Sequence, residues 1–153
     1  MRKLICFVAT ALLSVCLAAQ ENGSFKQAEQ QITATLNAQV EAWNRGDLHG
    51  FMRGYWNSPE LTFFSGGAVT KGWQPTLDRY RKRYQNAGSE MGKLAFDDLQ
   101  VTVFDADSAF VRGRWRLTMS NGKQPGGLFT LILRRKPEGW RIVHDHTSAD
   151  CSQ

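Results

Sequence analysis

The C-terminal half of the chain alternates between apolar and polar residues, and this alternation constrains the fold more than any other feature. A period of two is typical of strands that bury one face. Four segments show it, separated by short stretches with the composition of turns. They span residues 93–104, 108–119, 127–136 and 140–148. Because the connections are short, we expect neighbouring strands to pair antiparallel in a meander.

The N-terminal half instead carries apolar residues at steps of three and four, which predicts helices with one buried face. A capping box, Ser24 with Gln27, indicates where the first helix begins, and Gly46 is suited to end it. Asp47 then favours a second, shorter helix, which ends before Pro59. The expected buried positions are Phe25, Ala28, Ile32, Leu36, Val40 and Trp43, then Leu48, Phe51, Met52 and Tyr55.

A hairpin and a third helix precede the long strands. Residues 61–64 and 68–70 flank Ser65-Gly66-Gly67, and glycines suit a hairpin turn. Pro75 is acceptable in the first turn of the helix that follows. The apolar positions of this helix are Leu77, Tyr80 and Tyr84, and its basic positions are Arg79, Lys82 and Arg83. The basic side could bind an anion, although charged runs on helices more often face water.

The order of these elements predicts an α+β domain with three helices packed on one face of a curved antiparallel sheet. The strand at 127–136 is apolar on both faces, with Leu128 and Ile132 opposite Phe129, Leu131 and Leu133. Such a strand needs cover on both sides. We therefore expect a second copy of the chain to cover the outer face, which makes the protein a homodimer.

Residues 1–19 have the features of a secretory signal peptide. A basic start, an apolar run too short to span a bilayer, and Ala18-Ala19 near the cleavage point occur in the expected order. We therefore predict an exported protein, periplasmic or secreted, whose single domain spans residues 20–153. A lipid anchor through Cys16 fits less well, because Val15 is larger than the small residue expected before a lipidated cysteine.

The composition of the predicted mature chain limits its partners. Loss of Arg2 and Lys3 lowers the formal net charge from +5 to +3, which does not favour nucleic acid without a clustered basic stripe. No second apolar run follows the signal, so we expect no membrane contact after cleavage. Only Cys151 remains, and one cysteine cannot form an internal disulfide.

The strand at 140–148 carries two of the three histidines. In a regular strand Trp140, Ile142, His144 and His146 share one face, where the apolar pair marks the core side. Helices across one end of a curved sheet leave a hollow, and an aromatic hollow with a few polar groups is typical of a small-molecule site. Aromatic residues expected to reach it are Trp43, Tyr55, Trp56, Phe64, Trp115 and Phe129. Alternatively, these side chains only fill the core.

His144 and His146 admit three interpretations. Either could be a general acid or base on a carbonyl compound, or both could only satisfy buried polar groups. As metal ligands they would need a third partner, and the remaining histidine, His49, lies on a distant helix. We therefore predict no metal and, without phosphate-cradling or nucleophile motifs, no cofactor.

Asp145 lies between these histidines and points to the opposite face of a regular strand. There it could pair with Arg141, Arg112 or Arg114, which favours a structural role. A bulge in the strand would reverse this assignment.

Several short motifs together resemble one known superfamily. They are Val40-Glu41-Ala42-Trp43-Asn44-Arg45-Gly46-Asp47, Tyr55-Trp56, Gly66-Gly67, Gly72-Trp73, Gly113-Arg114-Trp115 and the segment 139–148. In order and spacing the chain resembles the nuclear-transport-factor-2-like superfamily, and within it the small SnoaL-like and ketosteroid-isomerase-like domains. The resemblance implies a cone-shaped α+β (cystatin-like) fold, a pocket between sheet and helices, and dimers.

The same resemblance implies activities that range from isomerases, dehydratases and polyketide cyclases to non-catalytic domains. Ketosteroid-isomerase relatives use an acidic base, whereas the pocket candidates here are His144, His146 and Tyr55. Our leading hypothesis is proton transfer on an apolar carbonyl compound, with a histidine as acid or base and Tyr55 as hydrogen-bond donor to the oxyanion. The alternative is a non-catalytic ligand-binding or dimeric association module.

Overall fold

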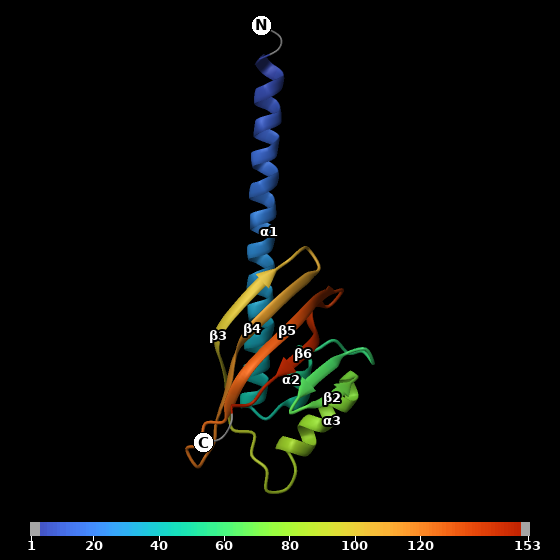
Figure 1. Cartoon of the computed structure of the whole chain (residues 1–153), viewed down its shortest axis with the longest axis vertical. Helices are drawn as coiled ribbons and strands as arrows, with labels where there is room; N and C mark the ends of the chain where they lie inside the picture. Colours follow the sequence, from blue (N-terminus) through green and yellow to red (C-terminus); the bar gives the residue numbers. More distant parts are fainter. Residues whose placement is uncertain (1–3, 151–153) are drawn as a thin grey trace.

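A computed structural model describes residues 4–150, with side chains from residue 23 onward. Of the predicted signal peptide only the backbone of residues 4–19 is described, Cys151 lies outside the described residues, and the expectations for both stay predictions. The helices are α1 (Leu4–Asn44), α2 (Leu48–Met52) and α3 (Trp73–Tyr84), and the strands are β1 (Thr62–Ser65), β2 (Ala68–Lys71), β3 (Lys93–Val103), β4 (Ser108–Thr118), β5 (Gly126–Lys136) and β6 (Gly139–Thr147) (Figure 1). The predicted α+β class with three helices is confirmed.

With one exception the helices begin where the sequence indicates, and α1 ends as indicated, whereas α2 ends at Met52, before the expected helical residue Tyr55. Gly46 takes a φ of 82°, and the Asp47 side chain accepts a hydrogen bond of 2.7 Å from the backbone N–H of Gly50. The exception is the start of α1, because the helix passes through Ser24 without interruption. The preceding residues are rich in Ala and Leu and contain no proline, so they favour helix as well. Among the described residues, no helix combines the length and apolar character needed to cross a membrane.

The six strands form one sheet in the order β2-β1-β6-β5-β4-β3. The four long strands pair antiparallel in the predicted meander. The sheet is nevertheless mixed, because β1 pairs parallel with β6, with Thr62 opposite His144. The parallel direction is set before β1 begins, since Tyr55 already forms a parallel bridge with Ile142.

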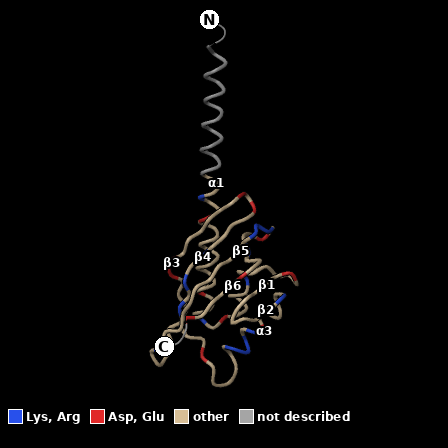
Figure 2. Tube along the Cα trace, in the orientation of Figure 1, with Lys and Arg blue, Asp and Glu red and all other residues tan. Residues whose placement is uncertain are grey.

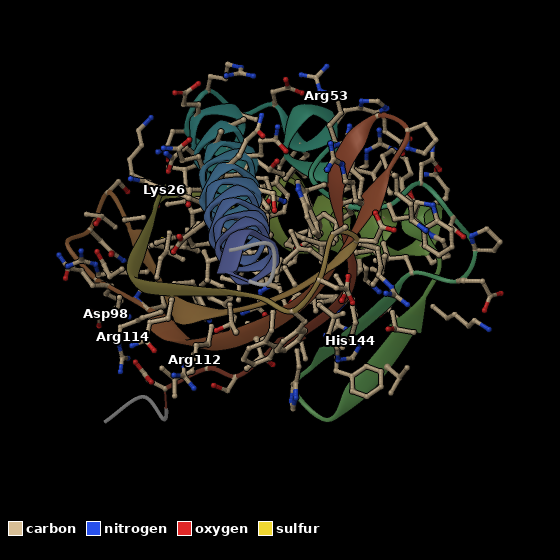
Figure 3. The ribbon with its side chains drawn as sticks, turned by 90° about the horizontal axis from the view of Figure 1, so that it is seen from above. Lys26, Arg53, Asp98, Arg112, Arg114 and His144 are labelled. Atoms are coloured by element: carbon tan, nitrogen blue, oxygen red, sulfur yellow. The ribbon has the colours of Figure 1, made fainter. Side chains whose placement is uncertain are left out.

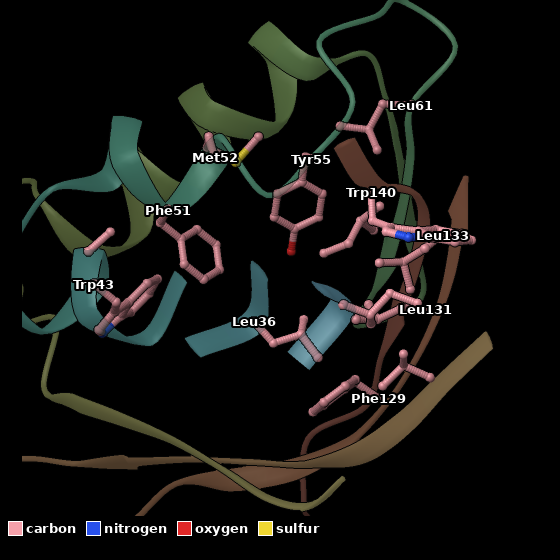
Figure 4. Packing of buried hydrophobic residues seen from close by; sticks show 14 of the residues in the cluster. Leu36, Trp43, Phe51, Met52, Tyr55, Leu61, Phe129, Leu131, Leu133 and Trp140 are labelled. Atoms are coloured by element: carbon pink, nitrogen blue, oxygen red, sulfur yellow. The ribbon is translucent and has the colours of Figure 1, made fainter. Parts of the chain in front are cut away.

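The core lies between the helices and one face of the sheet. Ile32 and Leu36 of α1 are fully buried, as are Val111 of β4 and Leu133 of β5. Figure 4 shows this packing, in which Leu36 lies near Leu131 and the ring of Tyr55 points into the same space. Burial of each such side chain contributes roughly 1.5–3 kcal/mol to stability.

The outer face of the sheet points away from α1 (Figure 3). Leu128 and Ile132 of β5 lie on it as predicted, 55% and 43% exposed. Its arginines are partly neutralised, because Arg114 pairs with Asp150 at 3.2 Å and Arg116 with Asp97 at 3.0 Å. Among the described residues this face therefore keeps exposed apolar side chains beside two paired arginines, while Arg112 donates to the neutral Gln100.

Candidate functional site

A β-bulge in β6 decides which side chains face the interior. Leu133 of β5 pairs with Ile142, but the preceding Ile132 pairs with His144, so Val143 is an extra residue in β6. A bulge interrupts the alternation of side chains. Ile142 and Asp145 are consequently both buried on the core side, at 1% and 3% exposure.

The bulge corrects our expectation for the histidines. His144 and His146 lie on the outer side, where both rings contact Phe64 of β1, with centroid distances of 4.9 and 6.0 Å. Nδ1 of His144 is 2.6 Å from Oγ1 of Thr62. Partial burial, with a smaller effect from nearby His146, lowers the pKa of His144 below its usual value of 6.5. Neither histidine lines the interior cavity, so the expected position facing the hollow is wrong for both.

The interior cavity has a volume of about 310 Å³ and lies between α1, α2, α3 and the sheet. This volume is at the lower end of the range for small-molecule sites. Aromatic side chains are the largest group in its wall, and α3, β1 and β6 also contribute polar side chains. The lining residues include Trp43, Phe51, Tyr55, Phe63, Ser65, Arg79, Tyr80, Arg83, Trp115, Phe129, Asp145 and Thr147.

The predicted aromatic residues divide into two groups. Trp43, Tyr55, Trp115 and Phe129 line the cavity. Trp56 and Phe64 lie elsewhere: the ammonium group of Lys136 sits 3.9 Å from the centre of the Trp56 ring, and Phe64 packs against the histidines. Phe64 lies outside the cavity because it is opposite His146 in the parallel pair of β1 and β6. Its side chain is therefore on the outer face of the sheet, together with His146.

Asp145 is the polar centre of the cavity wall. Oδ2 accepts a hydrogen bond of 2.7 Å from the Tyr55 hydroxyl, and Oδ1 accepts one of 2.7 Å from the Thr147 hydroxyl. Burial raises the pKa of Asp145 from 3.8 to about 6, while the two hydroxyl donors act in the opposite direction. A carboxylate with this pKa is mostly ionised at neutral pH and can accept a proton.

Two tyrosines extend this group of polar side chains. The hydroxyls of Tyr55 and Tyr80 lie 3.5 Å apart, so Tyr80, Tyr55 and Asp145 form a chain of hydrogen-bonding groups. Burial, together with the charge of Asp145, raises the pKa of both tyrosines well above 10. Both hydroxyls therefore stay protonated at neutral pH. Since Tyr55 donates its only proton to Asp145, Tyr80 is the donor in the long 3.5 Å contact with Tyr55, and it can turn this proton to a ligand instead.

The end of β6 forms part of the cavity rim. The Trp115 indole N–H donates a hydrogen bond of 2.8 Å to the carbonyl of Ser148, and the backbone N–H of Ser148 donates to the carbonyl of Leu128. Gly127 permits this approach, since a Cβ there would overlap the Ser148 carbonyl. The chain after β6 is thereby held against β5 at the mouth.

The described residues contain no cluster of three or more His, Cys, Asp or Glu side chains arranged to hold a metal ion. His49, the third histidine, packs against Trp73 with a centroid distance of 5.3 Å. Among the residues whose side chains are described, the polar groups that line the cavity are hydroxyls, two arginines, the Gln39 amide and one carboxylate, Asp145.

The sequence favoured a structural role for Asp145 unless the strand bulged, and it did not single out Tyr80 as a site residue. No local signal identifies the bulge, because Val143 fits a regular strand as well as an irregular one. Tyr80 was assigned to the buried side of its helix, and only the tertiary packing shows that its hydroxyl is directed to Tyr55.

Comparisons with known proteins agree with this architecture. Residues 32–151 match the model of the SnoaL-like domain. A crystal structure of an NTF-2-like protein of unknown function from Shewanella oneidensis MR-1 is 37% identical, with a TM-score of 0.73 over 78% of this chain and 98% of that one. No curated protein matches the sequence.

More distant structures share the fold. A ketosteroid isomerase-like protein from Erwinia carotovora atroseptica SCRI1043 is 22% identical, with a TM-score of 0.63 over 79% of this chain and 95% of that one. A protein with a cystatin-like fold from Nostoc punctiforme PCC 73102 is 8% identical, with a TM-score of 0.69 over 81% of this chain and 92% of that one. At these identities the likeness extends to the fold alone.

Proposed function

We propose that this chain, which belongs to the SnoaL-like domain family of the NTF2-like superfamily, binds a small apolar carbonyl compound in its cavity and moves a proton on it. The observation that carries the proposal is Asp145, a buried carboxylate with a pKa of about 6 in the wall of an aromatic cavity. Titratable groups with strongly shifted pKa values in a cavity are candidates for acid–base chemistry. Because one fold can serve many functions, the proposal is based on the residues of this cavity and not on the family.

In the proposed step Asp145 removes a proton from the carbon next to the ligand carbonyl. The electrons of the broken C–H bond form a C=C bond, and the carbonyl π electrons move to oxygen. The Tyr80 hydroxyl turns from Tyr55 and donates a hydrogen bond to that oxygen, while Tyr55 keeps donating to Asp145. The protonated Asp145 then returns the proton to the same carbon or to a conjugated one, which gives exchange or isomerisation.

Deuterium exchange tests this step directly. The probe is 2-tetralone, a compact aromatic ketone, and loss of its α-proton signals in D2O is followed by NMR. We expect wild-type protein to accelerate exchange, Asp145→Asn to slow it by about 10²- to 10⁴-fold, and Tyr80→Phe to slow it by about 10²-fold. Exchange that persists in Asp145→Asn would contradict the proposal. Binding of 2-tetralone without exchange by the wild type would favour the non-catalytic binding module.

We also propose that two copies of the chain pair through the outer face of the sheet. Leu128 and Ile132 are more than two-fifths exposed there, and the neighbouring Arg114 and Arg116 already have acidic partners. Exposed apolar side chains beside neutralised charges favour association with a similar surface.

We propose separately that the chain is exported, because residues 1–19 have the features of a secretory signal peptide.

A further inference from the structure

The mouth of the cavity carries an arginine whose position is fixed by neutral groups. Nη1 of Arg79 donates to Oγ1 of Thr70, and Nη2 donates to the carbonyl of Ser65, both at 2.9 Å. The guanidinium also lies over the Phe63 ring, 5.1 Å from its centre. Since a guanidinium has five N–H donors, further donors remain free for a ligand.

The charge of Arg79 has no partner among the described residues. Neither Arg79 nor Arg83 takes part in an ion pair within that part of the chain, whereas Arg81 of the same helix pairs with Asp78 at 3.5 Å. Arg79 is half-buried and lines the cavity. A partly desolvated cation without a counter-ion is costly, and a bound anion would remove that cost.

Arg83 lies one turn further along α3 and lines the same cavity. Its guanidinium is 5.4 Å from the centre of the Tyr84 ring. Figure 2 shows the basic residues of α3, of which Arg79 and Arg83 line the cavity and Arg81 and Lys82 do not. Residues four apart share one side of a helix, so the cavity receives two positive charges from one element.

The strand register separates this basic mouth from Asp145. Phe63 is opposite Asp145 in the parallel pair of β1 and β6, and Ser65, which accepts from Arg79, is opposite Thr147. Two residues along a strand correspond to about 7 Å. A ligand that contacts both Asp145 and Arg79 would therefore carry its carbonyl and its anionic group several bonds apart.

We propose that the natural ligand is an apolar oxo acid whose carboxylate binds Arg79 and Arg83 while its carbonyl end lies beside Asp145. This inference rests on the proposed function, of which it specifies the substrate class. Arginine suits the role because its planar guanidinium binds carboxylates through paired N–H groups. The aromatic wall then contacts the body of the ligand between the two polar ends.

Matched acids and esters test the inference. The probes are 4-oxo-4-phenylbutanoate, 5-oxo-5-phenylpentanoate and the methyl ester of each, measured by calorimetry near neutral pH. We expect wild-type protein to bind at least one acid about tenfold more tightly than its ester, and added salt to reduce that preference. Arg79→Met should abolish the preference and Arg83→Met should weaken it. Arg81→Met, a matched change on the same helix outside the cavity, should leave it intact.

The outcomes separate this inference from the proposed function. Equal affinity of acid and ester in the wild type, or a preference that persists in folded Arg79→Met, would overturn the anionic ligand. Asp145-dependent exchange of the ester would then leave the proposed function standing. Failure of every acid and ester to bind would also overturn the anionic ligand, and Asp145-dependent exchange of 2-tetralone would then decide the proposed function separately. Circular dichroism of each variant establishes that it is folded, and Arg83→Met provides a second test if Arg79→Met does not fold.

Discussion

The Tyr55 hydroxyl donates a 2.7 Å hydrogen bond to Oδ2 of Asp145, across 90 residues of sequence. Tyr55 follows α2 and Asp145 follows the bulge of β6, so the bond joins the helical layer to the sheet. It also fixes the orientation of Asp145, the one carboxylate that lines the cavity among the described residues. The acid–base properties of the site therefore depend on how the two layers pack.

Stability should fall as Asp145 ionises. The pKa of Asp145 is about 6 in the folded protein and 3.8 in the unfolded chain, so the folded state binds the proton more tightly. The resulting stabilisation is complete below pH 3.8 and lost as the pH rises through about 6. This difference corresponds to at most roughly 3 kcal/mol. Asp145→Asn stays neutral, so the difference in unfolding free energy between it and wild type should shift in favour of the variant as the pH rises to neutrality.

Urea unfolding at several pH values measures this difference. The useful quantity is the difference in unfolding free energy between Asp145→Asn and wild type, because the other carboxylates contribute equally to both proteins. If that difference did not change between pH 3.8 and neutrality, the raised pKa of Asp145 would be refuted.

Loss of the Tyr55 hydroxyl should raise the pKa of Asp145 further. The hydrogen bond from Tyr55 favours the ionised carboxylate, so Tyr55→Phe removes a stabilising partner of the charge. The exchange activity proposed above requires ionised Asp145 and should rise with pH through the pKa. Its midpoint is therefore expected near 6 in the wild type and higher in Tyr55→Phe. Rates of α-proton exchange measured against pH give both midpoints, and an unchanged midpoint would contradict the assignment.

Sequence periodicity predicted the elements well and the orientation at the site poorly. Helical and strand patterns depend on many residues, so one irregularity barely alters them. The direction of a side chain after a bulge depends on one extra residue, here Val143. Val143 is extra because of the register in which β6 pairs with β5. The same limit explains Phe64, whose face is set by parallel pairing with β6. The bulge at Val143 and the orientation of Phe64 thus both depend on contacts between residues that are far apart in the sequence.

The histidines should be dispensable for chemistry inside the cavity. In the double variant His144→Ala with His146→Ala, we expect 2-tetralone exchange within about twofold of wild type, because both rings lie on the outer side of β6. Stability should fall by about 1 kcal/mol, since the hydrogen bond between Thr62 and His144 is lost. A folded double variant that had lost exchange would restore the histidines as candidate acid–base groups.

Pairing of two chains should depend on the exposed apolar residues of β5. Leu128 and Ile132 are 55% and 43% exposed on the outer face, and a charge at either position would be buried without a partner in a dimer. We expect wild-type protein to sediment as a dimer at micromolar concentration, and Leu128→Glu with Ile132→Glu to sediment as a monomer that keeps its fold. Phe104→Ser is the matched control, because Phe104 is 62% exposed at the turn between β3 and β4. A monomeric wild type, or a dimer that survives both glutamates, would show that this face is not the interface.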